Sequence, residues 1–494
     1  MQRMDAVDRI RRSVKVQGWV AALIGVTLAG AVDAAETVTF RAGAAKGNIT
    51  PALGCEIVGG FNPFPSTHIH DDLWVRCLVL DDGTTRVAFA VCDLVGFTRH
   101  MSDAARRWIQ EETGLPAGNI LISAVHTHSA TTSLGDDRYL IELEMNAYQR
   151  TVARRVADTV RCAVNNLAPA RIGWATASEP RHVFNRRRYM KPGTVPMNPF
   201  GGTNDVVQFN PGHCNPNIVK PAGPTDPGIC LFAVQTPEGR PVAFFANYSL
   251  HYVGGVRGAD ISADYYGMFN DRIQHLLGAD RQDPPFISIM SNGTSGDINN
   301  IDFTRPAEKL PPYAKMRIVA DDVAQKAFQA YRTIQWRDHV ALGASYKEID
   351  LKFRRPTPEQ LARAEGVIRA KAASGRKGDT MESYFAERLV RMAKLPEYVK
   401  IPLQALRVGE VGIAAVPVEP FCEMGLDIKG RSLFKPTFVV SLANGYFGYL
   451  PTPAQLKLGG YEAWLGSNRL EPEAMPKMTD ALLRMLTGLK EGAK

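Results

Sequence analysis

The 494-residue sequence has no Cys-x-x-Cys pair among its seven cysteines, which argues against a zinc site built from thiolates. It also has no His-Glu-x-x-His segment and no glycine-rich phosphate loop, so neither a metalloprotease of that class nor a P-loop enzyme fits. The excess of positive charge is small, at 58 lysine and arginine residues against 50 aspartate and glutamate residues. No zinc finger or RNA-binding motif accompanies it, so we expect no nucleic-acid partner.

Long apolar runs are scarce, and the main one lies near the amino terminus. Residues 19–32 follow five basic residues and precede a small residue, Ala34, suited to a cleavage site. The run is short for a membrane span, although an uncleaved anchor is the alternative. Arg11 and Arg12 have a twin-arginine look, so the signal could be of the Sec or the Tat type. We expect a signal peptide over residues 1–34, export to the periplasm or medium, and a mature domain over residues 35–494.

The cysteines support this assignment only weakly. Cys214 and Cys230 flank a loop rich in proline and glycine and could form a disulfide outside the cytoplasm. The other five lie in or beside apolar stretches and are expected to act as small core residues: Cys55, Cys77, Cys92, Cys162 and Cys422.

Strand-like and helix-like segments alternate along the mature chain. Strands are predicted over residues 38–40, 73–80 and 87–91, with a hairpin turn at residues 81–83. A helix is predicted from an N-cap at Ser102 to a stop at Gly114, and others over residues 140–166, 264–277 and 314–330. Helices at this spacing imply parallel βαβ units. We therefore predict an α/β fold: a large single domain with mixed β-sheets flanked by helices, and ligands at the carboxyl ends of strands.

Two segments depart from this alternation. Residues 181–228 lack periodicity, which favours an ordered binding loop over a disordered linker, because strands resume on both sides. Residues 352–400 predict two helices, over 358–374 and 381–394, and carry twelve basic against six acidic residues. This basic helical segment could touch anionic lipid as a peripheral membrane contact, or be a solvated hairpin.

The strand at residues 120–125 ends in His126-Thr127-His128. Histidines two apart on an extended chain face the same side, and zinc accepts imidazole nitrogen at about 2.0–2.1 Å. A polar turn that happens to hold two histidines is the alternative. Other strand-like runs also deliver polar groups, and the carboxyl ends of parallel strands gather ligands. The residues so delivered are His251, Asp297, Glu419, Tyr446 and Tyr449.

With these motifs, and with Ala443-Asn-Gly-Tyr-Phe-Gly-Tyr449, the chain resembles the N-terminal catalytic domain of neutral/alkaline non-lysosomal ceramidases, which are secreted zinc amidases. The likeness runs from about residue 40 to the end. It implies that His126, His251, Glu419 and Tyr449 hold zinc, with Tyr446 a rival for the last position.

The resemblance also implies active-site roles for Arg186, which follows Asn185, and for Tyr461, twelve residues beyond Tyr449. Arg186 could instead be a plain ion-pair partner. His128, facing the same pocket, could carry a proton or support a metal ligand. Asn299, with Arg186 and Tyr461, could stabilise an oxyanion.

Two features depart from the family. Asn299 stands where the family carries a serine, which puts the ceramide substrate in doubt. Only about thirty residues follow Tyr461, too few for the family's immunoglobulin-like C-terminal domain. The resemblance thus implies hydrolysis of an amide (N-acyl) bond in a small-molecule or lipid substrate by attack of zinc-bound water. The alternatives are a non-ceramide amide, an ester or a carbohydrate-derived substrate at the same site, or a non-catalytic binding scaffold.

Overall fold

Three mixed β-sheets carry the fold of this computed structural model, which describes residues 39–494 except 61, 132, 135–143, 376–377 and 493–494. The first sheet has the order β7-β6-β5-β1-β8: Ile120–Ala124, Arg86–Cys92, Trp74–Asp81, Arg41–Asn48 and Ala168–Pro169. The second is β17-β15-β14-β9: Ile287–Asn292, Pro241–Tyr248, Gly228–Gln235 and Arg171–Ser178. The third is β19-β20-β21-β23: Leu342–Lys352, Tyr398–Val408, Val411–Ala415 and Thr437–Val440.

Each of these sheets ends in one parallel pair of strands, and a helix makes each crossover. The pairs are β6 with β7, β15 with β17, and β21 with β23. The crossover helices are α1 (Arg99–Thr113), α3 (Asp264–Leu276) and α7 (Cys422–Arg431). The predicted βαβ units and the α/β class are confirmed. Because parallel strands share a direction, the loops after them collect polar groups at one edge of each sheet.

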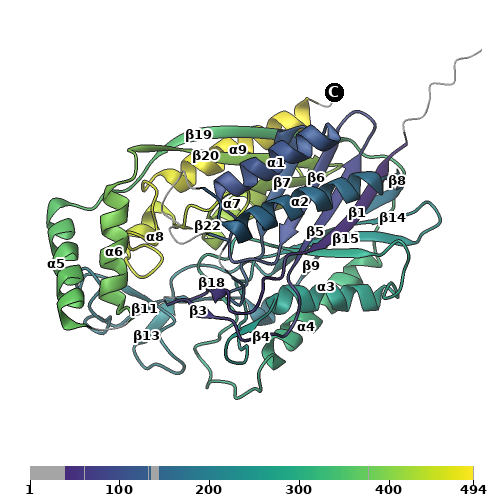
Figure 1. The fold of residues 1–494 in the computed structure, drawn as a ribbon. Coiled ribbons are helices and arrows are strands. Elements are labelled where there is room, and N and C mark those ends of the chain that lie inside the picture. Colours follow the sequence, from purple (N-terminus) through teal and green to yellow (C-terminus); the bar gives the residue numbers. More distant parts are fainter. Residues whose placement is uncertain (1–38, 61, 132, 135–143, 376–377, 493–494) are drawn as a thin grey trace, which may run out of the picture. The chain divides into compact units, whose positions relative to one another are not determined.

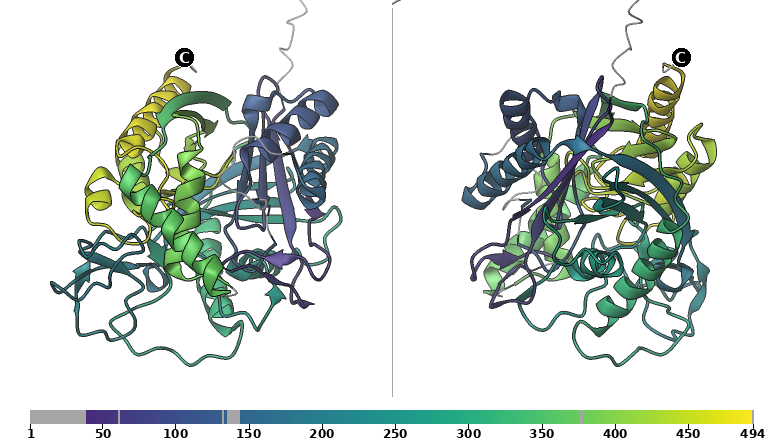
Figure 2. Two further views of the ribbon diagram at one scale, coloured as in Figure 1. Left: turned by 60° about the vertical axis from the view of Figure 1, so that its left-hand side comes forward. Right: turned by 90° about the vertical axis from the view of Figure 1, so that its right-hand side faces the viewer.

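The remaining long helices cover the sheets (Figure 1). α2 (Ala147–Asn165) packs beside α1 on the first sheet, and α4 (Ala314–Tyr331) packs beside α3 on the second. α9 (Ala474–Glu491) lies along β20 of the third sheet. α5 (Pro358–Ser374) and α6 (Met381–Ala393) form a helical hairpin, seen in green in Figure 2.

The three sheets share a core through one ring from each. Phe89 of β6 and Phe245 of β15 have ring centroids 5.2 Å apart, and Phe245 and Phe438 of β23 are 6.0 Å apart. All three side chains are fully buried. Aromatic pairs at this spacing add to the stabilisation from burial.

The segment after β23 joins the parallel edges. Ser441 N donates to Asn292 O at the end of β17 (3.0 Å), and Leu442 O accepts from Ala124 N at the end of β7 (3.2 Å). Asn444, at φ 63°, is buried and bonded through its side chain on both sides. Its Oδ1 accepts from Ile122 N (3.1 Å), and its Nδ2 donates to Gln404 Oε1 of β20 (2.9 Å). This segment therefore fixes the three strand ends relative to one another.

Some predicted boundaries were wrong. The first strand begins at Arg41 and not within residues 38–40, of which residue 38 is outside the described residues. Its alanines and glycines have weak β propensity, yet they form a strand. The reason is that α2 packs closely against this strand, and only small side chains leave room for it. A Cβ at Gly43 would lie 2.1 Å from Ala163 O of α2. Tertiary packing thus overrides propensity here.

Some helix ends were predicted correctly and others were not. α1 begins at Arg99 with Thr98 as N-cap; Ser102 lies inside it and donates its N–H to Thr98 O. Gly114 ends the helix at φ 70°, as predicted. α2 begins at Ala147 behind a capping box of Asn146 and Gln149, while residues 140–143 of the predicted helix lie outside the described residues.

The aperiodic stretch at residues 181–228 is ordered, as predicted. It contains a three-stranded sheet in the order β12-β11-β13: Val207–Phe209, Arg187–Met190 and Ile218–Pro221. The short strand β10 (Phe184–Asn185) pairs with β18 (Ile298–Asn299) and so ties this stretch to the turn after β17. In the described part of the chain, no helix combines the length and the apolarity needed to cross a bilayer.

All seven cysteines are free thiols. Cys230 is buried beside Thr437 O, whereas Cys214 is exposed beside Thr304 O, so the two do not form a disulfide. Cys162 is exposed on α2, which corrects its prediction as a core residue.

Replacing Asn444 tests the joint between the sheets. Asn444→Ala removes two buried hydrogen bonds and forces alanine into the left-handed region, and should lower the free energy of unfolding by about 3–4 kcal/mol. Asn444→Gly removes the same bonds without the backbone strain, and should cost about 1 kcal/mol less. Urea unfolding of both variants measures this; equal losses would show that the positive φ contributes nothing.

Candidate metal centre

His126 follows β7 and has a strained backbone. Its φ is 78°, which is rare for a residue with a side chain and marks functional positions. Two bonds to the loop after β6 hold it there: its N–H donates to Leu94 O (2.9 Å), and its ring Nδ1 lies 2.6 Å from Val95 O. A carbonyl oxygen only accepts, so Nδ1 carries the hydrogen and Nε2 presents a lone pair.

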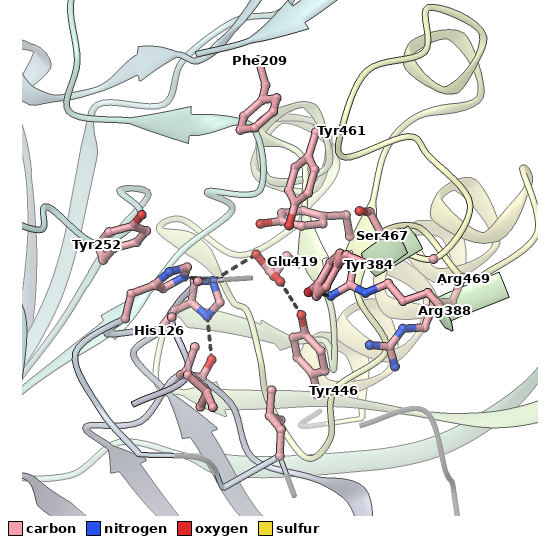
Figure 3. A pocket seen from close by; sticks show the side chains of 18 of the residues that line it. His126, Phe209, Tyr252, Tyr384, Arg388, Glu419, Tyr446, Tyr461, Ser467 and Arg469 are labelled. Carbon is pink, nitrogen blue, oxygen red and sulfur yellow. Dashed lines mark hydrogen bonds and ion pairs between the residues drawn. The ribbon is translucent and has the colours of Figure 1, made fainter. Parts of the chain in front are cut away.

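His251 follows β15 and is oriented in the same way. Its Nδ1 lies 3.0 Å from Ser295 O, in the turn after β17, so its Nε2 also presents a lone pair. Both Nε2 atoms face one oxygen of Glu419. Oε2 is 3.1 Å from His126 Nε2 and 3.8 Å from His251 Nε2. Figure 3 shows His126 directed at Glu419 in the middle of the pocket.

Glu419 is placed by a short parallel ladder. β22 (Glu419–Pro420) pairs with β24 (Tyr449–Leu450), and Glu419 is the direct partner of Tyr449. Partners in register project to the same face, so both side chains reach the pocket. Close approach of the turn after β17 requires Gly296, because a Cβ there would lie 2.5 Å from Glu419 O. Tyr446 Oη donates to the second carboxylate oxygen, Glu419 Oε1 (2.8 Å).

The donor set fits a divalent cation. Glu419 Oε2 and His251 Nε2 are buried, and neither has a hydrogen-bond partner within the described residues. Three acceptor atoms that face one another without a hydrogen between them repel, and burial removes the water that would screen them. Imidazole nitrogen with one carboxylate oxygen is a ligand set that zinc takes. The repulsion would be relieved by a metal ion.

The protonation states agree with this interpretation. Burial, and next the charge of Arg186, lowers the pKa of His251 well below its usual value. Burial would raise the pKa of Glu419, but opposing interactions, among them the hydrogen bond from the Tyr446 hydroxyl, hold it well below its usual range. Glu419 is therefore a carboxylate and His251 a neutral imidazole near neutral pH, which are the forms that bind metal.

His128 lies close to the other two histidines of the site. Its Nε2 is 3.1 Å from His126 Nε2, and nitrogen atoms of His126, His128 and His251 lie within 4.8 Å of one another. Its ring stacks on Tyr252, with centroids 3.8 Å apart. Burial, and next His126, lowers the pKa of His128 well below its usual value. Geometry alone thus groups His128 with the two histidines that face Glu419, whereas the family resemblance leaves it out of the ligand set.

Arg186 is both an ion-pair partner and a pocket residue. Its Nε donates to Glu462 Oε1 (2.7 Å), while Arg187 Nη1 donates to Glu462 Oε2 (2.9 Å). The Arg186 guanidinium lies 5.4 Å from the Tyr449 ring centroid, and its buried Nη2 has no hydrogen-bond partner with suitable geometry in the described part of the chain. Glu462 therefore holds Arg186 in the cavity wall, beside Tyr449.

The predicted tyrosines line the cavity, but Asn299 does not. The Tyr449 and Tyr461 ring centroids are 5.7 Å apart, and Phe209 stacks on Tyr461 at 4.7 Å. Burial raises the pKa of Tyr461 to about 12, so its hydroxyl remains a donor. Asn299 instead donates to Asn210 Oδ1 (2.8 Å), and Asn210 is the residue that faces the cavity. Because Asn299 pairs with Phe184 in the β10–β18 ladder, its side chain does not line the cavity.

Asp297 lies outside the cavity and connects the segment that carries Glu419 with the segment that carries Arg186. Its Oδ1 accepts from Cys422 N at the start of α7 (2.8 Å), and its Oδ2 accepts from Asn185 Nδ2 (2.7 Å). Its backbone O accepts from Arg186 N (2.8 Å). Burial raises the pKa of Asp297 to about 7, although the bond from Cys422 opposes this. Asp297 thus holds the segments of Glu419 and Arg186 without facing the cavity.

The cavity itself measures about 200 Å³. Sequence reasoning missed several of its polar residues. Tyr252 directly follows His251, and Glu462, which binds the cavity residue Arg186 without lining the cavity itself, directly follows Tyr461. This adjacency was a usable signal. Tyr384 and Arg388 are four apart on α6, on one face of a helix. Arg469 has no local signal, because it reaches the cavity only through the fold.

Comparison with solved structures identifies the fold. The structure of neutral ceramidase from Pseudomonas aeruginosa aligns with a TM-score of 0.67 at 15% identity, covering 92% of this chain and 75% of that one. A ceramidase complexed with C2 aligns with a TM-score of 0.65 at 14% identity, covering 92% and 76%. No family model and no curated protein sequence matches the chain. The chain has the fold of neutral ceramidase, as the resemblance predicts.

The Asp297 carboxyl gives stability an identifiable pH dependence. Because its folded pKa is about 7 against 3.8 in a model peptide, the folded protein keeps a proton that the unfolded chain releases, and this contribution is lost as pH rises through 7. Asparagine cannot ionise. The stability of wild type minus that of Asp297→Asn should therefore fall by about 2–3 kcal/mol between about pH 5 and pH 8. Urea unfolding in the presence of a chelator measures it; a difference independent of pH would contradict a protonated Asp297.

Proposed function

We propose that the protein is a zinc-dependent hydrolase that cleaves an amide (N-acyl) bond, with zinc held by His126, His251, Glu419 and Tyr449. The observation that carries the proposal is that buried Glu419 Oε2 lies 3.1 Å from His126 Nε2 and 3.8 Å from His251 Nε2, while Glu419 Oε2 and His251 Nε2 have no hydrogen-bond partner within the described residues. The shared fold with neutral ceramidase supports the hydrolase class. Zinc bound there would polarise the substrate carbonyl and lower the pKa of a water molecule.

The side chains around this position have separable tasks. Arg186 Nη2 and the Tyr461 hydroxyl would donate to the oxygen that gains negative charge when water adds to the carbonyl carbon. His128 would take the proton from that water and pass it to the departing amine nitrogen. Tyr446 would hold Glu419 Oε1, which keeps Oε2 turned toward the histidines.

Substrate and location belong to the same proposal. The relative complexed with C2 is a ceramidase, which supports a small-molecule or lipid amide. Export is supported by the sequence of residues 1–34, which lie outside the described residues. A peripheral membrane contact through residues 352–400 is compatible with a second role for this hairpin, since α6 also contributes Tyr384 and Arg388 to the cavity wall.

Metal content tests the site directly. Purified wild type should hold about one zinc per chain, and His126→Ala and Glu419→Ala should each hold almost none, because each loses a ligand atom. His275→Ala, an exposed histidine on α3, is the matched control and should keep its zinc. His128→Ala should also keep it; loss there would place His128 among the ligands. Mass spectrometry of the metal measures all five proteins.

Hydrolysis is then assayed on the same preparations by release of free fatty acid from N-acyl substrates. Activity should disappear with a chelator and return with zinc in wild type and in the His275→Ala control. Wild-type protein that binds no zinc when zinc is supplied would contradict the proposal. Full occupancy without turnover of any amide or ester would favour the binding scaffold instead.

Tyr446 and Tyr449 can be told apart by removing one oxygen atom at a time. Tyr446→Phe should lower zinc affinity by about 10–100-fold, the usual cost of losing a group that orients a ligand. Tyr449→Phe should lower it further, because a ligand itself is lost. Competition with a chromophoric chelator measures both affinities. The reverse order would make Tyr446 the ligand.

A further inference from the structure

The segment at the start of α3 is bonded to the turn that carries His126 and His128. Ser262 N donates to Ser129 O (2.9 Å), and Ser262 O accepts from the Thr127 hydroxyl (2.8 Å). Thr127 and Ser262 are fully buried. These two bonds hold the chain on both sides of His128, because Thr127 precedes it and Ser129 follows it. Residues far away in the sequence therefore fix this turn.

Asp264 makes a corresponding contact with the loop that carries the third histidine. Its Oδ1 accepts from Val253 N (2.9 Å), and its Oδ2 accepts from Gly254 N (2.9 Å). These are the first two N–H groups after His251 and Tyr252. Hydrogen bonds to an ionised carboxylate are about twice as strong as bonds between neutral groups. One carboxylate thus holds the chain immediately beyond both rings.

Further hydrogen bonds connect the two contacts within the segment itself. Asp264 N donates to the Ser262 hydroxyl (3.1 Å), and this hydroxyl donates to Asp71 Oδ2 (2.7 Å). Asp71 Oδ1 accepts from Ala263 N (2.6 Å). A displacement of Asp264 would therefore displace Ser262 as well, so one small unit holds both histidine loops.

The rings carried by the two loops touch one another in the site. Tyr252 stacks on His128 (Figure 3), with ring centroids 3.8 Å apart and ring planes 14° from parallel. His251 meets His126 edge to face, with centroids 4.6 Å apart. In each pair, one ring comes from the loop that follows β15 and the other from the turn that follows β7. The relative position of the two loops therefore sets both contacts.

Asp264 has a costly conformation and environment. It is fully buried, and its φ of 59° lies in the left-handed region that few residues other than glycine adopt. Burial raises the pKa of Asp264 to about 6, although the N–H groups of Tyr265, Val253 and Gly254 oppose this rise. Only the bond from Tyr265 N (2.7 Å) serves the start of α3, because the other two lead to a different loop. Buried and strained carboxylates are enriched at functional positions.

We infer, on the basis of the proposed zinc site, that Asp264 is a positioning residue of that site. Its side chain does not line the cavity. It holds the loop of His251 directly and the turn of His126 through Ser262, so that the imidazoles keep the spacing at which one metal ion can bind both. Loss of the carboxylate removes no ligand, but it lets the two histidines move apart and so weakens metal binding.

The zinc affinity of Asp264→Asn and Asp264→Gly tests this inference. Asparagine and glycine both tolerate a positive φ, but asparagine keeps one acceptor oxygen and glycine keeps none. Zinc affinity should fall by about 10–100-fold in Asp264→Asn, the usual loss for a group that orients a ligand, and further in Asp264→Gly. Competition with a chromophoric chelator measures it.

Asp82→Asn is the matched control. Asp82 is also a buried carboxylate outside the cavity, and it too accepts N–H groups from two segments, at Thr85 and Leu342. This variant should lose unfolding free energy to a similar extent, measured with urea, and keep its zinc affinity. A zinc affinity lowered equally by Asp82→Asn would overturn the positioning role, because general destabilisation would then explain the effect.

Thr127→Val tests the other end of the link and leaves Asp264 in place. Valine has the shape of threonine but cannot donate to Ser262 O, so zinc affinity should fall here too. This variant also decides the matter if the Asp264 variants fold poorly. Unchanged zinc affinity in Thr127→Val would overturn the link through Ser262.

Hydrogen exchange on the metal-free protein separates this inference from the zinc proposal. Asp264→Asn should speed the exchange of amides in residues 126–129, although the hydrogen bonds of Asp264 itself go to other residues. Wild type that binds no zinc but shows this change in the variant would contradict the zinc hydrolase and uphold the coupling of the two loops. Zinc affinity and hydrolysis equal to wild type in both Asp264 variants would overturn the positioning role and leave the hydrolase standing.

Discussion

The arrangement of this protein depends on one buried constraint: a carboxylate oxygen faces imidazole lone pairs with no hydrogen between them. Glu419 Oε2, His126 Nε2 and His251 Nε2 can lie this close only if a cation relieves their repulsion or the surrounding structure holds them. The structure does hold them. Val95 O and Ser295 O fix the two ring orientations, and Tyr446 fixes the carboxylate. Such a preorganised set could hold a metal ion without having to rearrange.

The supporting groups come from different sheets, and the fold explains how they meet. Each large sheet ends in a parallel pair whose loops open toward the same place, and the residues after β23 join those edges. Asp297 adds a second link, between the start of α7 and the Asn185-Arg186 segment. Three residues at or beside these joints have a positive φ: His126 (78°), Leu442 (53°) and Asn444 (63°). Backbone strain at these three positions accompanies the turning of strand ends toward one another.

Different side chains occupy the two ends of the cavity. The histidine end is suited to a metal ion, and the opposite end carries Arg388 and Arg469 held against Tyr384 and Tyr446. α6 belongs to the basic helical segment whose charge the sequence suggests as a membrane contact. In the folded protein one of its arginines lines the cavity.

The sequence by itself determined the features that depend on local physics. The strand before His126, the turn at residues 81–83, the glycine stop at Gly114 and the ordered stretch at residues 181–228 follow from period, propensity and φ. Together with the family resemblance, the polar residues at strand ends placed His126, His251, Glu419 and Arg186 in one site. Only the tertiary structure decided that Asn299 donates to Asn210, that Glu462 forms ion pairs with both Arg186 and Arg187, and that Arg388 and Arg469 lie on the side of Glu419 away from His126. These contacts join residues far apart in the chain, and no local pattern encodes a meeting that arises from the packing of three sheets against one core.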